Sequence, residues 1–267
     1  MRWMRLLFLH WQVEADMLRP LVPACLEIDR FDGRAWVGLV PFTMTLRHRL
    51  TPGIPTARRF HECNVRTYVT GGDPGVPGVW FFSLDAASRL AVCAARAMWH
   101  LNYVHSRIDM SRDGDEAIHY QVRRVKRPDQ GMACAWRPGR AIEWPSDPPS
   151  LPGRGPGGGS SPGIADDDQS STTPPSHPHP GPLPQGRGSQ ALARFLTDRY
   201  AMYAVDKRGR CWRGRVWHPP WSLRDAEVLE LNDGLVRSAG IEIDASAPPL
   251  AYCADAMDVE AWPLERV

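Results

Sequence analysis

Lysine is nearly absent from this sequence. Lys and Arg together number 32, yet only Lys126 and Lys207 are lysine. Asp and Glu number 30, so the formal net charge is only +2. Nucleic acids and anionic membranes attract proteins through a concentrated excess of basic residues. The sequence therefore predicts neither a nucleic-acid partner nor a membrane partner.

Long hydrophobic runs and paired cysteines are also lacking. The apolar run at residues 6–9 gives way at once to His10 and Gln12. It is shorter than the core of a signal peptide and far short of the roughly 18 residues of a spanning helix. The six cysteines are widely spaced, without a Cys-x-x-Cys pair. These absences predict a cytoplasmic protein whose cysteines are reduced and buried as small hydrophobic residues.

Several motifs of enzyme chemistry are missing as well. The sequence has no Gly-x-Ser-x-Gly elbow, no phosphate-binding loop, no His-Glu-x-x-His and no Gly-x-Gly-x-x-Gly after a strand. His61, Glu62 and Cys63 are consecutive, but neighbours on a strand point to opposite faces and cannot bind one ion together. We therefore predict neither a metal site nor a cofactor.

Glycine and proline are concentrated in one segment. Residues 146–188 are rich in both and have few apolar side chains to bury, which predicts a disordered insert in a surface loop. Such an insert costs little, because loop-closure entropy grows only logarithmically with length. We expect one domain made of residues 1–145 and 189–245, followed by a C-terminal tail at residues 246–267.

The rest of the chain indicates a mainly β fold with few helices. Segments rich in aromatic and β-branched residues, separated by Gly and Pro, predict strands at 35–46, 60–70 and 78–84. Turn sequences predict two hairpins, one joining 104–110 to 116–125 and one joining 200–205 to 211–217. Residues 88–99 fit either a short helix or a strand at 90–94, and residues 189–196 suggest a helix.

Several motifs resemble a known superfamily. The stretch 18–29, with Leu18-Arg19-Pro20 and Leu26-Glu27-Ile28-Asp29, resembles the opening segment of the acetoacetate decarboxylases, and 60–69 and 78–86 follow in that order. When the segments 195–200 and 218–221 are added to these motifs, the chain more closely resembles the YqjF-like family of uncharacterised bacterial proteins. The resemblance implies an acetoacetate-decarboxylase-like fold, a closed cone-shaped β-barrel with a flanking sheet and an interior cavity.

The resemblance does not extend to the decarboxylase reaction. Those enzymes form a Schiff base through a lysine that lies just ahead of a Leu-Gly-Tyr segment. The corresponding segment here is Leu101-Asn102-Tyr103, and residues 97–100 contain no lysine. A stable imine needs a primary amine, so Schiff-base decarboxylation is not expected and no catalytic residue is assigned. Lys126, among arginines, and Lys207, in a predicted turn, are poor replacements.

A polar set on one predicted strand is the candidate ligand site. Glu62, Asn64 and Arg66 share a strand face, and through the resemblance Glu62 corresponds to a carboxylate of the decarboxylase pocket. If this face lines the barrel interior, the three side chains, roughly 6 to 7 Å apart, can orient a small carboxylate or carbonyl compound. They can equally form a satisfied network that holds the barrel closed.

Two further candidates lie outside this strand. Arg96 fits either an anion-binding residue or a cross-strand salt bridge, and Tyr103 can donate a hydrogen bond to a ligand.

Three functions remain open. The first is a binding protein for a small carboxylate or carbonyl compound, without known catalysis. The second is an enzyme that uses Glu62 as general acid or base on a keto acid, which requires burial to raise the pKa of this carboxyl. The third is a non-catalytic structural or interaction protein with a filled barrel and a homo-oligomeric surface.

Overall fold

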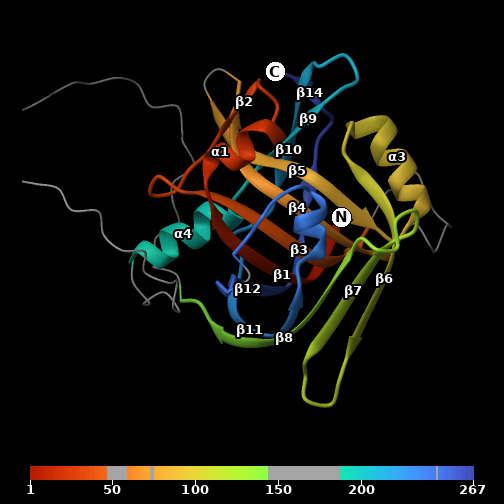
Figure 1. Cartoon of the computed structure of the whole chain (residues 1–267), viewed down its shortest axis with the longest axis vertical. Helices are drawn as coiled ribbons and strands as arrows, with labels where there is room; N and C mark the ends of the chain where they lie inside the picture. Colours follow the sequence, from red (N-terminus) through yellow and green to blue (C-terminus); the bar gives the residue numbers. More distant parts are fainter. Residues whose placement is uncertain (47–58, 73–74, 144–186, 245) are drawn as a thin grey trace, which may run out of the picture.

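The computed structural model describes residues 1–46, 59–72, 75–143, 187–244 and 246–267. Within these ranges one 14-stranded sheet closes on itself (Figure 1). Nine of its strands form the ring, in the order β1 (Arg2–Val13), β3 (Ala35–Thr45), β4 (Arg59–Gly71), β5 (Val76–Ala86), β6 (Tyr103–Arg112), β7 (Ile118–Arg124), β8 (Gly131–Ala141), β11 (Arg224–Asn232) and β12 (Leu250–Asp258). Because β12 pairs back onto β1, the predicted closed barrel is confirmed.

A smaller sheet branches from the ring at β5. The C-terminal part of β5 pairs with β6, whereas Val79 and Trp80 near its start pair in parallel with β9 (Ala201–Val205). β9 leads on to β10 (Cys211–Trp217), which pairs with β13 (Glu260–Ala261) and β14 (Glu265–Arg266). The short β2 (Leu26–Ile28) pairs with β4. The flanking sheet implied by the family resemblance is therefore present.

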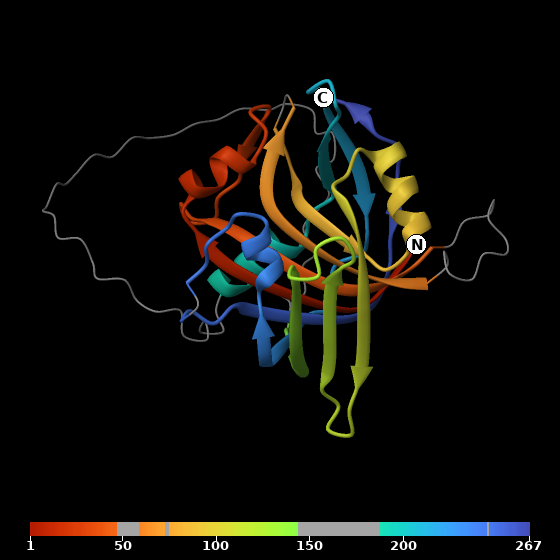
Figure 2. The same cartoon turned by 45° about the vertical axis from the view of Figure 1, so that its right-hand side comes forward.

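Both predicted hairpins are confirmed. β6 and β7 run antiparallel on either side of Asp113 and Gly114, and β9 and β10 pair across the turn at residues 206–210. Figure 2 shows the yellow-green hairpin of β6 and β7 projecting beyond the rest of the ring, with β8 beside it. The expected C-terminal tail, residues 246–267, contains β12, β13 and β14. The expected disordered insert lies, up to residue 186, outside the described residues.

Four short α-helices and one 3-10 turn accompany the strands of the described ranges. They are α1 (Ala15–Leu18), η1 (Arg19–Leu21), α3 (Arg89–Trp99), α4 (Arg187–Thr197) and α5 (Gly234–Ser238). Residues 88–99 fitted either a short helix or a strand at 90–94, and the structure shows the helix α3. The Ser88 hydroxyl accepts a hydrogen bond from the Ala91 amide (3.3 Å), which is a helix cap, and His100 ends the helix at φ 51°. The strand alternative at 90–94 is wrong.

The inside of the ring holds a cluster of large apolar side chains. β6, β7 and β8 bury one side only, because their alternate residues, such as Arg107, Gln121 and Arg123, are exposed. The buried side joins one cluster with residues from β1, β3 and β4, which include Leu7, Leu9, Val37, Leu39, Cys63, Val65, Ile108, Tyr120, Val122, Cys134 and Trp136. Only the inward face of a ring brings all these strands together, so Cys63 and Val65 mark the inward face of β4.

The opposite face of β1, β3 and β4 is covered by other elements. Leu6, Phe8, Val40 and Phe42 form a second cluster with Val92 of α3, Ala193 of α4, Tyr103 and Trp221. Because strand residues alternate, Glu62, Asn64 and Arg66 lie on this outward face and not in the ring interior. The condition set in the sequence analysis, that this face lines the barrel interior, is therefore not met, although all three residues are buried.

The cysteine prediction is correct in part. Cys63, Cys134, Cys211 and Cys253 are buried, but Cys25 and Cys93 are exposed, and all six are free thiols. No helix in the described ranges is both long and apolar enough to span a bilayer.

A candidate ligand site in a buried polar layer

Glu62 is a buried carboxyl in a hydrogen-bonded pair. It lies on β4 between Phe42 of β3 and Ala86 of β5, with only 2% of its surface exposed. The Tyr103 hydroxyl donates to Oε2 of Glu62 at 3.0 Å. Burial raises the pKa of Glu62 to about 8, although the Tyr103 hydrogen bond acts in the opposite direction. At neutral pH the side chain is therefore a protonated carboxyl.

Arg66 is a buried cation beneath the C-terminal end of α4. Its Nη2 donates to the Leu196 carbonyl at 3.0 Å, and its Cζ lies 5.7 Å from the ring centroids of Phe8 and Tyr68. The carbonyl end of a helix attracts a cation. Nevertheless, no acidic side chain of the described residues forms an ion pair with Arg66, and its Nε has no hydrogen-bond partner.

His10 packs directly against Arg66. The residue between them in the sheet is Gly38, where a Cβ atom would lie 3.2 Å from Cδ2 of His10 and 3.4 Å from Cγ of Arg66. A glycine at this position therefore allows the close approach of imidazole and guanidinium. Burial, and then the charge of Arg66, hold the pKa of His10 well below its ordinary value. His10 is a neutral imidazole whose two nitrogens both lack partners.

Among the residues that the structure describes, the buried side-chain nitrogen and oxygen atoms without a hydrogen-bond partner belong to five residues of three neighbouring strands. They are Nε1 of Trp3, both ring nitrogens of His10, Nε1 of Trp36, Oδ1 of Asn64 and Nε of Arg66. All these atoms, among the residues that the structure describes, belong to the outward face of β1, β3 and β4. Buried polar groups in folded proteins are nearly always hydrogen-bonded to protein or to a bound molecule. We call His10, Asn64 and Arg66 the polar layer.

A second buried polar cluster, inside the ring, is fully satisfied. Asp85 accepts two hydrogen bonds from Arg124, at 2.9 and 3.0 Å, and one from each of the hydroxyls of Ser106 and Ser83. Its carboxylate is completely buried, and the Arg124 side chain is 11% exposed. With every partner supplied by the protein, this cluster links β5, β6 and β7 and has a structural role.

The structure brings together only part of the predicted site. Glu62 and Tyr103 are in contact, and Asn64 and Arg66 share their face. Arg96 does not join them, because it is exposed on α3 and its Nε donates to the Tyr103 backbone carbonyl at 2.7 Å. Its cross-strand interpretation is also wrong, since residue 96 is helical. This contact attaches α3 to the start of β6.

The two lysines and His10 lie outside the predicted set of ligand-site residues. Both lysines, Lys126 and Lys207, are exposed in turns between strands, so neither reaches Glu62. The sequence analysis did not single out His10, which the structure places beside Arg66. Its position in the otherwise apolar run of β1, alternating with Leu6 and Phe8, was the available indication.

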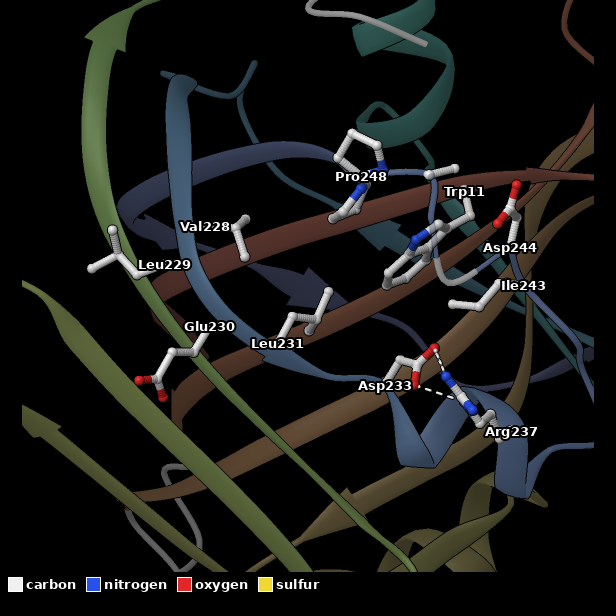
Figure 3. Close-up of a pocket in the computed structure, with 12 residues that line it drawn as sticks. Trp11, Val228, Leu229, Glu230, Leu231, Asp233, Arg237, Ile243, Asp244 and Pro248 are labelled. Atoms are coloured by element: carbon white, nitrogen blue, oxygen red, sulfur yellow. Dashed lines mark hydrogen bonds and ion pairs between the residues drawn. The ribbon is translucent and has the colours of Figure 1, made fainter. Parts of the chain in front are cut away.

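One surface pocket lies at an end of the ring and contains none of the predicted residues. It has a volume of about 310 Å³ and is lined by Trp11, by residues 228–231 of β11 and by the segments around α5 (Figure 3). Its Asp233 and Arg237 form an ion pair at 2.9 Å. No group of three or more His, Cys, Asp or Glu side chains placed to hold a metal ion occurs among the described residues.

Solved structures of low sequence identity share this architecture. The enduracididine biosynthesis enzyme MppR complexed with pyruvate matches with a TM-score of 0.61 at 10% identity, covering 99% of this chain and 88% of that chain. An acetoacetate decarboxylase from Legionella pneumophila matches with a TM-score of 0.55 at 9% identity, covering 100% of this chain and 86% of that chain. The ring and its flanking sheet therefore define an acetoacetate-decarboxylase-like fold.

Sequence comparison identifies the family within this fold. The uncharacterized protein YqjF of Bacillus subtilis (strain 168) is 36% identical over 266 residues, which cover 99% of this chain and 90% of that protein. The DUF2071 family, described as an uncharacterized conserved protein, matches residues 1–151 and 169–258. The chain belongs to the DUF2071 family, and the resemblance to the YqjF-like family is confirmed.

Proposed function

We propose that this protein binds a small carboxylate or carbonyl compound in the polar layer, without Schiff-base chemistry. The observation that carries the proposal is the confinement of the unpartnered buried polar atoms to one face of β1, β3 and β4. A bound acid would give the buried Arg66 cation a counter-charge and would supply acceptors for its Nε and for His10. The site lies between the ring and its covering elements, not inside the barrel.

The chemistry of the three side chains favours a carboxylate or a carbonyl oxygen. A guanidinium offers N–H donors in a fixed planar arrangement that matches carboxylate oxygens. The neutral His10 can donate from one nitrogen and accept at the other, and the Asn64 amide can do both. MppR, which shares the fold, was solved with pyruvate, a small 2-oxo acid. We therefore choose pyruvate and acetoacetate as probes.

Calorimetric titration of the purified protein with pyruvate and acetoacetate tests this proposal. We expect saturable binding of at least one acid, weakened about tenfold or more in Arg66→Gln, because a hydrogen bond to a charged group contributes about 1.5–3 kcal/mol. Arg123→Gln, which removes an exposed arginine of β7, is the matched control and should bind as the wild type does.

A purely structural role for Arg66 predicts a different result. Arg66→Gln would then lower the melting temperature, since Arg66 caps α4, while neither the wild type nor the variant would bind an acid. Asn64→Ala provides a second test if Arg66→Gln does not fold. Absence of saturable binding, together with no small molecule in native mass spectra of the purified protein, would reject the proposal.

One observation favours a second function, general acid catalysis by Glu62. A carboxyl that stays protonated at neutral pH can donate a proton to a developing enolate or oxyanion. Glu62 and Arg66 are four residue steps apart along β4, so their Cα atoms are about 13 Å apart. A substrate held at Arg66 would have to span the gap between the two side chains to reach Glu62, so the length of the substrate is the variable to test.

Turnover of β-keto acids of increasing chain length tests the enzyme hypothesis. If Glu62 is the acid, Glu62→Gln should lower kcat about 10²–10⁴-fold, because the amide keeps the shape but has no acidic proton. Glu27→Gln, an exposed glutamate on β2, is the control for charge removal. Equal activity of Glu62→Gln and the wild type, or no activity in either, would reject catalysis by Glu62.

A further inference from the structure

A second surface groove lies where β5 gives way to α3, beside the start of β4. It has a volume of about 640 Å³. Its lining residues come from β1, β4, β6 and the start of α3 and are Arg5, Arg59, Phe60, His61, Ala87, Ser88, Arg89, Leu90 and Met110. It shares no residue with the polar layer or with the pocket of Figure 3.

Three arginines from three different elements converge on this groove. Arg5 belongs to β1, Arg59 begins β4 and Arg89 begins α3. All three are exposed, and none forms an ion pair with the residues of the described ranges. None of the described residues that line the groove carries a carboxylate. Other arginines of the described ranges are held by carboxylates, such as Arg124 by Asp85 and Arg199 by Asp29.

The positive charges of two of these arginines, Arg5 and Arg59, act on His61. Burial, then the charges of Arg59 and Arg5, lower the pKa of His61, and the charge of Asp109 only partly opposes them. The His61 ring lies at 3.0 Å from the Thr43 hydroxyl, measured from Nδ1. A neutral imidazole at this position leaves the arginines as the charged groups of the groove.

The backbone directs Arg5 out of the regular alternation of β1. Arg5 has φ 54°, in the left-handed region that residues other than glycine rarely adopt, and the register of β1 with β3 shifts between Met4 and Leu9. Such bulges change the direction of a side chain and often adjoin functional sites. Here the irregularity places Arg5 in the groove with Arg59 and Arg89.

The amino terminus of α3 adds backbone donors at the same place. In the first turn of a helix, the N–H groups have no intrahelical acceptor and carry a partial positive charge. Ser88 satisfies the amide of Ala91, which leaves those of Arg89 and Leu90 at the groove. Phosphate groups bind well where arginines and helix amides meet.

We infer that this groove is a binding site for a small molecule that carries a phosphate-type dianion. The arginines and the start of α3 would hold the dianion, since three positive charges exceed what one carboxylate neutralises. Phe60, Leu90 and Met110 provide apolar surface for an organic portion of the ligand. The inference is independent of the acid site that we propose at Arg66.

Titration with phenyl phosphate and with inorganic phosphate, at low ionic strength, tests the inference. The wild type should bind phenyl phosphate saturably and more tightly than inorganic phosphate, because of the apolar lining. The triple variant Arg5→Gln, Arg59→Gln, Arg89→Gln should lose at least about 30-fold in affinity, since each charged contact contributes roughly a factor of ten.

A matched triple variant separates a site from general charge attraction. Arg107→Gln, Arg123→Gln, Arg127→Gln removes the same charge from exposed positions elsewhere and should bind phenyl phosphate as the wild type does. Equal losses in the two triple variants, or no saturable binding by the wild type, would overturn the inference. Should the groove triple variant not fold, the three single variants replace it, each with an expected loss of about 3–10-fold. Pyruvate binding should be unchanged in the groove variants, so this result and the acid site are tested separately.

Discussion

Replacing Arg124 with leucine should lower the free energy of unfolding by about 3–5 kcal/mol, because it leaves a buried carboxylate without its cation. Asp85 is completely buried inside the ring, and two of its hydrogen bonds come from Arg124. The hydroxyls of Ser83 and Ser106 would remain as its only side-chain partners among the described residues. Urea unfolding of both proteins at pH 7 measures the difference.

The neighbouring arginine is the natural control for this change. Arg123 lies next to Arg124 on β7, but it faces solvent, so Arg123→Leu should alter the free energy of unfolding by no more than about 0.5 kcal/mol. In a double-mutant cycle, Asp85→Asn should recover part of the loss, since the uncompensated charge is then gone. Equal stabilities of the two arginine variants would show that Arg124 does not compensate Asp85.

The second large effect is a pH dependence that Glu62 imposes on stability. The folded protein holds a proton on Glu62 up to a pKa of about 8, whereas the unfolded chain loses it near the ordinary value for glutamate. Between these two pKa values the native state binds more protons than the unfolded state, so stability falls as the pH rises. The fall should amount to roughly 3–5 kcal/mol between pH 5 and pH 9.

Glu62→Gln should remove this dependence. Glutamine keeps an acceptor for the Tyr103 hydroxyl and has no proton to lose, so the fall in unfolding free energy that Glu62 causes should be missing from its pH profile. Glu27→Gln should keep the wild-type profile, because Glu27 is exposed. Parallel profiles for Glu62→Gln and the wild type would mean that Glu62 ionises in the folded state as it does in the unfolded chain.

Local patterns in the sequence account for many of the individual strands. Residues 35–46, 60–70 and 78–84 carry the β-branched and aromatic residues of strands, and the Asp113-Gly114 turn predicts the β6–β7 hairpin. The strands β1, β8, β11 and β12 were not predicted. The ring closes through the pairing of β12 with β1, between segments at opposite ends of the chain, and no local pattern contains that information.

In the candidate site, too, the local sequence determines some features and the packing of distant segments determines others. Period-two alternation by itself determined that Glu62, Asn64 and Arg66 share a face, and the sequence alone determined that no lysine stands ahead of Leu101-Asn102-Tyr103. Alternation cannot say which face is inward, because both faces of β4 are buried. Only the tertiary structure decided this: α4 covers the Arg66 face, and the partner of Arg66, the Leu196 carbonyl, is 130 residues away in the chain. The partners of a buried polar group depend on packing between distant segments, so they are set by the fold and not by the local sequence.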